Sequence, residues 1–392
     1  MRLWMSQRQR TSKLPAVNPL EPPYGGLSLY IHVPFCGRKC PYCAFESKVP
    51  SEGERELWLE QLKKEFLWWR ERIGVPSLKT CYIGGGTPTM LSGPQWKKLI
   101  ESVEDNFTFF PDSEVTVEAN PNSLAAEHLL EWRDWRVTRV SLGVQSFDDA
   151  ELEMLGRLHS AAQAYEAVSA SLASGFEVSI DLMFGLPYQT LQNWARSLKD
   201  GVKTGVKHIS LYQLSLEENT PWQNMDRALL SDGYVFCRWA QWYLAQKGYN
   251  QYETANFSKP GFESRHNLNY WREGDYLGVG PSASGYLRGW RYKNVNSLRE
   301  YELCLAKGTS AVSTGERLSP EASAKEASVL ALRTFEGINT ANYALKYGED
   351  ALSCVFGVLN NFPKELWTFD GEKITLTKKG MRVANIIWEE LV

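Results

Sequence analysis

Three closely spaced cysteines are the part of the sequence best suited to chemistry. Cys36, Cys40 and Cys43 form a CxxxCxxC array directly after a short apolar run. A structural zinc site takes four protein ligands, and the next cysteine, Cys81, lies far along the chain inside another apolar run. A cubane iron–sulfur cluster has four irons, so three thiolates bind three of them and leave the fourth open to another ligand. The spacing therefore predicts a [4Fe-4S] cluster; a partial zinc site or a reduced structural trio is the alternative.

Polar residues recur where the predicted strands end. The second apolar run ends in GGGTPT, residues 84–89, and a glycine run can expose backbone amides to a close ligand. The third ends in EANP, which places the Glu118 carboxylate where it can pair with an ammonium group or a ribose hydroxyl. Each residue alone could be structural, but the recurrence strand after strand favours a binding site. The later residues of this series are Gln145, Arg157 and Asp181.

The elements that must position these residues alternate between β-rich runs and helical patterns, which is typical of parallel strands joined by crossover helices. The predicted helices include one that begins with a capping box of Ser51 and Glu54. Six (βα) units, with the cysteine loop after the first strand, predict an α/β fold: a partial, three-quarter (βα)6 TIM-like barrel with its chemistry at the carboxyl ends of the strands. The predicted strands are residues 27–33, 80–83, 114–119, 139–144, 177–183 and 208–214.

The second half of the sequence loses this alternation. A long helix is predicted over 227–248, followed by an irregular stretch to about residue 294 that is rich in Gly, Asn, Tyr and Trp. Helical patterns then precede a hairpin turn at Asp370-Gly371 and a final helix over 381–391, which together predict a smaller C-terminal α/β winged-helix-like domain. We divide the chain into an extended tail (1–25), the partial barrel (26–225), an extension (226–315) and the C-terminal domain (316–392).

The whole-chain composition is that of a globular protein. The chain has 392 residues, of which 43% are hydrophobic and 23% charged, and a net charge of -3, which argues against a general nucleic-acid binder. Four further cysteines are scattered, as expected in a reducing compartment, so we expect a cytoplasmic protein without a transmembrane segment or signal peptide. The first twenty residues are basic and lack acidic residues, which leaves an organellar transit peptide as an alternative to a basic tail.

The CxxxCxxC array resembles that of the radical S-adenosylmethionine superfamily, in which the open iron is chelated by the amino and carboxylate groups of S-adenosylmethionine. More specifically, YIHVPFC, GGGTP, GVQSF, LGRLH and DLMFGLP resemble the oxygen-independent coproporphyrinogen III oxidase group, over essentially the whole chain. The resemblance implies one or two S-adenosylmethionine molecules as cofactor. The contacts that it implies are Tyr30, Tyr42, Gly85, Gly86, Thr87, Glu118, Gln145, Arg157 and Asp181.

Two features separate the chain from the oxidases of that group. The oxidase pattern has a further cysteine two positions after the third cluster cysteine, where this chain has Phe45. In addition, the segment HNLNYW, residues 266–271, is similar to the HNxxYW motif of the HemW branch, which implies a haem chaperone that passes haem to an acceptor such as a respiratory enzyme. The alternatives are the radical decarboxylase that forms protoporphyrinogen IX, and a related radical methyltransferase or haem-degrading enzyme. We assign no catalytic residue.

The HNLNYW segment contains the candidate haem ligands. His266 stands in the predicted irregular, aromatic-rich stretch and could be an axial ligand of haem iron. Tyr270 and Trp271 could then cover the macrocycle. The alternative is a buried structural histidine that is hydrogen bonded to the backbone.

Overall fold

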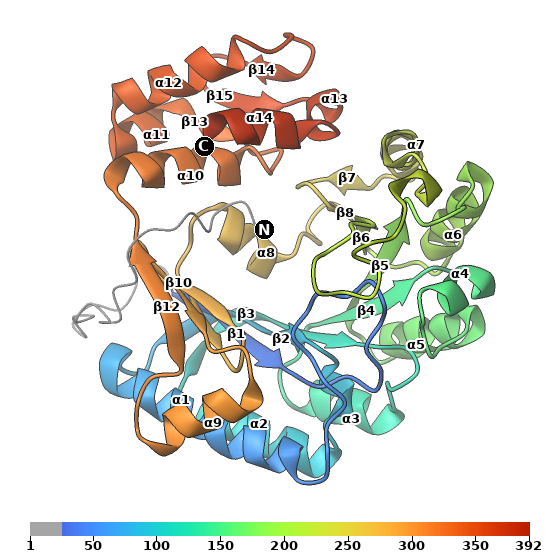
Figure 1. The fold of residues 1–392 in the computed structure, drawn as a ribbon, viewed down its shortest axis with the longest axis vertical. Helices are drawn as coiled ribbons and strands as arrows, with labels where there is room; N and C mark the ends of the chain where they lie inside the picture. The colour runs from blue at the N-terminus through green and yellow to red at the C-terminus, as the bar shows by residue number, and fades with distance from the viewer. Residues whose placement is uncertain (1–25) are drawn as a thin grey trace.

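Six parallel strands form the centre of the molecule. The structure is a computed structural model that describes residues 26–392, so the predicted tail over residues 1–25 lies outside the described residues. Neighbouring strands pair in sequence order, each parallel to the next (Figure 1). This arrangement confirms the partial barrel, although β2 and β3 are longer than predicted. The strands are β1 (Leu27–Val33), β2 (Ser77–Gly85), β3 (Thr108–Ala119), β4 (Arg139–Gln145), β5 (Glu177–Phe184) and β6 (His208–Gln213).

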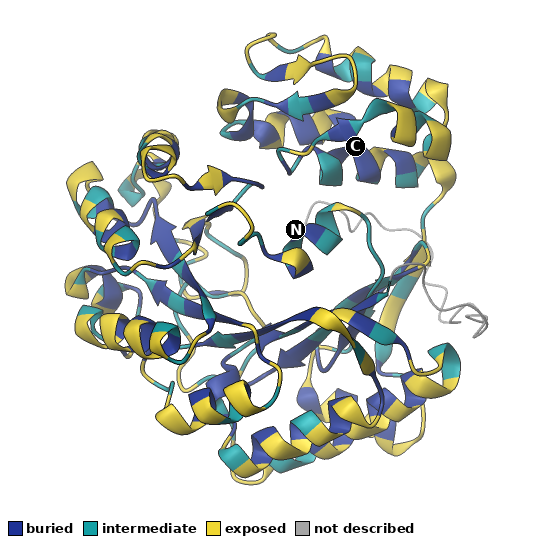
Figure 2. Cartoon of the chain, turned by 180° about the vertical axis from the view of Figure 1, so that it is seen from behind, coloured by how far each residue is buried: buried dark blue, intermediate teal, exposed yellow. Residues whose placement is uncertain are grey.

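Helices cover the outer face of these strands, with their exposed sides turned to solvent (Figure 2). The core between the helices and the sheet is unusually rich in tryptophan, and the largest fully buried side chains include Trp58, Trp69, Trp96, Trp132 and Trp194. These five tryptophans therefore fill the core. The crossover helices are α1 (Glu54–Ile73), α2 (Gly93–Glu104), α3 (Ala126–Asp134), α4 (Asp149–Met154), α5 (Ala161–Ala173) and α6 (Leu191–Lys203).

The predicted capping box at the start of α1 is wrong in part. The backbone N–H of Ser51 donates to the Glu54 carboxylate at 2.7 Å, as a capping box requires. However, the N-cap is Gly53, whose φ of 79° is left-handed and suits glycine. Ser51 therefore lies two residues before the N-cap, and its hydroxyl does not cap the helix.

The stretch predicted to be irregular is instead part of the sheet. β7 (Asn250–Gln251) and β8 (Asn256–Ser258) extend the edge at β6, and β9 (Tyr276–Val279) pairs parallel with β1 at the other edge. Three antiparallel strands continue from β9, so the sheet has twelve strands. Strands of two to six residues contain too little of the alternating pattern to be recognised by it. The antiparallel strands are β10 (Ser284–Leu287), β11 (Trp290–Asn294) and β12 (Val312–Arg317).

Three further helices belong to this second half. The single helix predicted over 227–248 is broken, because the Asp232 side chain accepts the N–H groups of Tyr234 and Val235 and so begins a new helix, α7 (Gly233–Gln246). A short 3-10 turn, η2 (Arg227–Leu229), precedes it. Helix α8 (Arg265–Trp271) lies between the sheet and the C-terminal helices (Figure 1), and α9 (Leu298–Ala306) packs beside α1.

The C-terminal residues form a second hydrophobic core of their own. A three-stranded sheet of β13 (Ile338–Asn339), β15 (Lys373–Leu376) and β14 (Trp367–Phe369) packs with the helices, and the predicted hairpin turn lies at Gly371, whose φ is 99°. This is the predicted winged-helix-like arrangement, except that the last helix is divided in two. The helices are α10 (Pro320–Ala331), α11 (Thr340–Tyr347), α12 (Glu349–Leu359), α13 (Lys378–Met381) and α14 (Ala384–Leu391). Within residues 26–392 no helix is both long and apolar enough to cross a membrane.

Candidate functional site

The three clustered cysteines lie in the loop that follows β1, at the carboxyl end of the parallel strands. All three are free and half-buried. Burial raises the pKa of the Cys43 thiol, and the charges of Cys40 and Cys36 raise it further, so the three sulfurs interact with one another. Among the described residues, no group of three His, Cys, Asp or Glu side chains lies close enough together to hold a single metal ion. A four-iron cluster, which takes one thiolate per iron, does not need such a group.

Two side chains from other loops donate hydrogen bonds to these sulfurs. The Thr87 hydroxyl donates to Cys36 Sγ at 3.4 Å, and Arg157 Nη1 donates to Cys40 Sγ at 3.7 Å. Donors to the sulfurs are a general means by which proteins stabilise and tune iron–sulfur clusters. The residues of this loop therefore fit the predicted [4Fe-4S] cluster.

The glycine run at the end of β2 packs directly against the cysteine loop. A Cβ at Gly85 would lie 2.3 Å from His32 Nδ1, and one at Gly86 would lie 2.5 Å from the Phe35 carbonyl oxygen, so only glycine fits. The prediction that this run presents free amides is wrong. The N–H groups of Gly85, Gly86 and Thr87 donate to Glu118, Val33 and Phe35, at 2.9, 2.8 and 2.6 Å.

The Glu118 carboxylate lies near the carboxyl end of β3 and is held there by two hydrogen bonds. Tyr82 donates its hydroxyl to Oε1 at 2.7 Å, and the Gly85 amide donates to Oε2 at 2.9 Å. Burial raises the pKa of Glu118. Burial also raises the pKa of Asp181 to about 7, and the charge of Glu118 adds to this effect. The two carboxyl groups therefore lie close enough for the charge of one to affect the ionisation of the other.

The other predicted cofactor contacts lie around the same end of the strands. Tyr30 shares a hydrogen bond of 3.0 Å with His32 Nδ1, and Tyr42 packs against Trp222 with ring centroids 6.0 Å apart. Gln145, at the end of β4, has a left-handed φ of 67°. Such strain in a non-glycine residue is often found at functional sites.

The structure adds a residue that the sequence did not single out. Asn120 follows Glu118 in the EANP motif and hydrogen bonds both Thr87 and Arg157. A small cavity of about 20 Å³ beside the cysteine loop is lined by Cys40, Thr87, Asn120 and Arg157 among others. Only the position of Asn120 next to a strand end could have drawn attention to it, because its partners lie 33 and 37 residues away.

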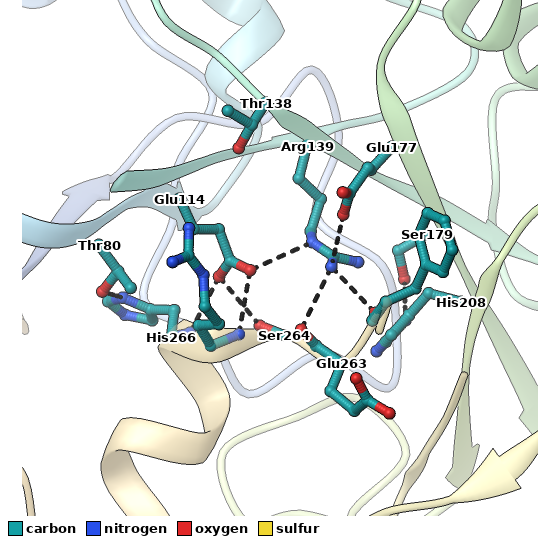
Figure 3. A network of polar contacts seen from close by, with 12 residues as sticks. Thr80, Glu114, Thr138, Arg139, Glu177, Ser179, His208, Glu263, Ser264 and His266 are labelled. Carbon is teal, nitrogen blue, oxygen red and sulfur yellow. Dashed lines mark hydrogen bonds and ion pairs between the residues drawn. The ribbon is translucent and has the colours of Figure 1, made fainter. Parts of the chain in front are cut away.

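His266 belongs to helix α8, in contrast to the predicted irregular stretch, and is only 1% exposed. Its Nδ1 lies 2.7 Å from Thr80 Oγ1 (Figure 3). Its Nε2 lies 2.7 Å from the Tyr270 hydroxyl. The Thr80 hydroxyl donates to Ser28, so Nδ1 carries the proton and Nε2 accepts from Tyr270. Burial lowers the pKa of His266 to about 3, which keeps the ring neutral.

Helix α8 separates two spaces. His266 stacks on Tyr82, with ring centroids 5.0 Å apart, and Tyr82 in turn bonds Glu118, so this face points toward the cofactor contacts. Other α8 residues, Arg265, Leu268 and Arg272, line a cavity of about 720 Å³ at the amino ends of β3, β4 and β5. Trp271 lies under the Arg333 guanidinium of the C-terminal domain at 5.3 Å. Of the three candidate haem residues, His266 and Tyr270 therefore contact each other, whereas Trp271 contacts the C-terminal domain.

Comparisons with known proteins agree with this geometry. Residues 30–201 match the family model described as the Radical SAM superfamily. The solved coproporphyrinogen III oxidase (HemN) from Escherichia coli superimposes with a TM-score of 0.83 at 22% identity, covering 96% of this chain and 91% of that chain. At this identity the likeness shows the fold.

Curated relatives extend over nearly the whole chain. Heme chaperone HemW of Lactococcus lactis subsp. lactis (strain IL1403) is 34% identical, covering 93% of this chain and 97% of the relative. HemW of Bacillus subtilis (strain 168) is 35% identical, covering 92% and 98%. HemW of Mycobacterium tuberculosis (strain CDC 1551 / Oshkosh) is 33% identical, covering 98% and 99%. The chain therefore belongs to the HemW family within the radical S-adenosylmethionine superfamily.

Proposed function

We propose that this protein is a haem chaperone that binds a [4Fe-4S] cluster, S-adenosylmethionine and haem, and that it transfers haem to an acceptor protein in the cytoplasm. The observation that carries the proposal is the similarity, over 92% or more of the chain, to relatives named heme chaperones. An acceptor such as a respiratory enzyme follows from the same resemblance.

Cys36, Cys40 and Cys43 would hold the cluster, since Thr87 and Arg157 already donate to two of their sulfurs. When bound and reduced, such a cluster supplies an electron to S-adenosylmethionine. The chain would orient that ligand by its own polar groups. Among the proposed contacts of S-adenosylmethionine, Glu118 accepts two hydrogen bonds that hold its carboxylate in one orientation. The other contacts proposed are Tyr30, Tyr42, Gly85, Gly86, Thr87, Gln145, Arg157 and Asp181.

The shared fold with HemN keeps the radical decarboxylase as a second candidate. Against it, Phe45 occupies the position of the additional oxidase cysteine. Phe45 lies in the cysteine loop and is 65% exposed. No thiol is present there to act on a substrate. We therefore rank the chaperone first.

The two candidates differ in their response to coproporphyrinogen III. We expect the reconstituted, reduced protein to form no protoporphyrinogen from coproporphyrinogen III and S-adenosylmethionine, because Phe45 replaces the cysteine of the oxidase pattern. In a parallel titration we expect haem to saturate at about one equivalent per chain and produce a Soret band. Porphyrin fluorescence after oxidation measures the first result, with an active oxidase as the positive control. Stoichiometric protoporphyrinogen would reverse the ranking.

His266 is the proposed haem ligand, and its contacts give its replacement two expected effects. His266→Ala removes the acceptor of the Tyr270 hydroxyl and the donor to Thr80, so we expect the free energy of unfolding to fall by about 1–3 kcal/mol. If Nε2 binds the iron, haem must also bind more weakly and with a shifted Soret band. Denaturant unfolding and a haem titration of the same variant measure both.

Two control variants separate the roles. His128→Ala removes another buried histidine with two backbone partners, Leu91 and Ala125, and should lower stability without changing the Soret band. Tyr270→Phe removes the hydroxyl that occupies Nε2, so a His266-ligated haem should bind at least as tightly. An unchanged Soret band in His266→Ala would exclude His266, and its loss in Tyr270→Phe would assign the ligand to Tyr270.

A further inference from the structure

Asn120 connects the two side chains that hydrogen bond the cluster cysteines. Its Nδ2 donates to Thr87 Oγ1 at 2.9 Å, and its Oδ1 accepts from Arg157 Nη2 at 2.7 Å. Thr87 in turn donates to Cys36 Sγ and Arg157 to Cys40 Sγ, at 3.4 and 3.7 Å. The single side-chain amide of Asn120 is thus linked, through Thr87 and Arg157, to two of the three predicted cluster ligands. Asn120, Thr87 and Arg157 are all distant from these cysteines in the sequence.

The chemistry of these groups determines the direction of each hydrogen bond. A guanidinium only donates, so the amide atom that faces Arg157 must be the oxygen. The amide nitrogen is then left to donate to Thr87. Because the Thr87 oxygen accepts this bond, its own proton is available for Cys36 Sγ. Arg157 Nη2 also donates to the Gly143 carbonyl at 2.7 Å, and this second anchor helps to hold Nη1 toward Cys40.

We propose that Asn120 is a positioning residue that raises the reduction potential of the cluster by directing hydrogen bonds to Cys36 and Cys40. Donors to cluster sulfurs stabilise the reduced, more negative state and are among the features that set the potential. Asn120 itself touches no sulfur among its hydrogen bonds, so it acts through Thr87 and Arg157. The inference rests on the cluster of the proposed function and does not depend on haem transfer.

The test is Asn120→Asp, which keeps the shape of the side chain and removes its N–H donors. A carboxylate keeps its bond to Arg157 but accepts the Thr87 proton, so Cys36 Sγ loses its donor. We expect the ratio of reduced to oxidised cluster at a fixed solution potential to fall about tenfold, which corresponds to 59 mV for one electron. The measurement is a redox titration of the reconstituted full chain followed by electron paramagnetic resonance, with iron, sulfide and thermal midpoint determined on the same samples.

Two further variants isolate the cause. Asn122→Asp adds the same charge at an exposed position that lines the same cavity, and we expect a much smaller shift because it leaves the Thr87 bond intact. Thr87→Val removes the donor to Cys36 directly and should lower the potential in the same direction. When Asn120→Asp is combined with Thr87→Val, the additional shift in potential should be no larger than the shift that Asn122→Asp causes alone.

The outcomes distinguish this inference from the proposed function. If the wild type and Asn120→Asp both contain a full cluster and titrate at the same potential, only this inference is overturned. Thr87→Val at the wild-type potential would overturn it too, even where Asn120→Asp fails to retain its cluster. A wild-type chain that takes up no iron or sulfide under reconstitution would overturn both the inference and the cofactor of the proposed function.

Discussion

Cys40→Ala is expected to remove nearly all iron and sulfide from the anaerobically purified protein. Two thiolates would then hold a cluster with four irons, so two irons would lack a protein ligand. Arg157 Nη1, which donates to Cys40 Sγ, would also lose its acceptor beside the cluster. Cys36→Ala and Cys43→Ala should have the same effect. Iron and sulfide analysis together with the visible absorbance of the cluster measures the loss.

The other cysteines provide matched controls. Cys354 is exposed and Cys304 half-buried, and both lie outside the partial barrel, so Cys354→Ala and Cys304→Ala should retain full iron content. Cys81 is a less suitable control, because it is buried in β2 and its replacement would also leave a cavity. Full iron content in Cys40→Ala would refute the cluster assignment.

Arg139→Met is expected to lower the free energy of unfolding by about 3–5 kcal/mol, the cost of breaking a buried ion pair by removing one partner. The Arg139 side chain is 3% exposed, and its Nε lies 3.6 Å from Glu114 Oε2, in a side chain that is 5% exposed. A second carboxylate, Glu177, lies 2.8 Å from Nη2. Without the guanidinium, Glu114 would remain as a buried charge with no cation beside it (Figure 3).

This ion pair also supports the helix that contains the candidate haem ligand. Glu114 accepts the backbone N–H groups of Arg265 and His266, at 3.0 and 2.9 Å, and so binds the first turn of α8. Denaturant unfolding of the full chain measures the loss. We expect much of it to be recovered in the double variant Arg139→Met/Glu114→Gln, because the neutral amide oxygen can still accept those N–H groups.

An exposed pair is the control for this comparison. Lys98 and Glu56 are 57% and 44% exposed and lie 2.5 Å apart, so Lys98→Met should cost at most about 1 kcal/mol. A loss in Arg139→Met no larger than that in Lys98→Met would show that the buried network contributes little to stability.

The partial barrel and the cysteine loop could be predicted from the sequence because both are encoded in local sequence patterns. The six parallel strands have enough apolar residues to be recognised, and the predicted bounds of β1 agree with the structure. Polar residues at the ends of parallel strands must gather at one edge of the sheet, so Glu118 and Asp181 could be expected near the cysteines before any coordinates were known.

The sheet extension could not be predicted in this way. β9 pairs with β1 although more than two hundred residues separate them in the chain, and neither strand contains a signal for the other. The same holds for His266, whose partner Thr80 is 186 residues away. A histidine that looked like an available ligand in the sequence is therefore buried in a helix with both ring nitrogens hydrogen bonded.

The amino-acid sequence by itself determined the order of the six parallel strands, the cysteine spacing and the identity of the polar residues at the strand ends. Only the tertiary structure decided which of these groups have partners: the glycine amides are used by Glu118, Val33 and Phe35, and Asn120 connects Thr87 with Arg157. The physical reason is that hydrogen-bond partners and burial depend on contacts between distant segments, whereas strand and motif patterns depend on neighbouring residues.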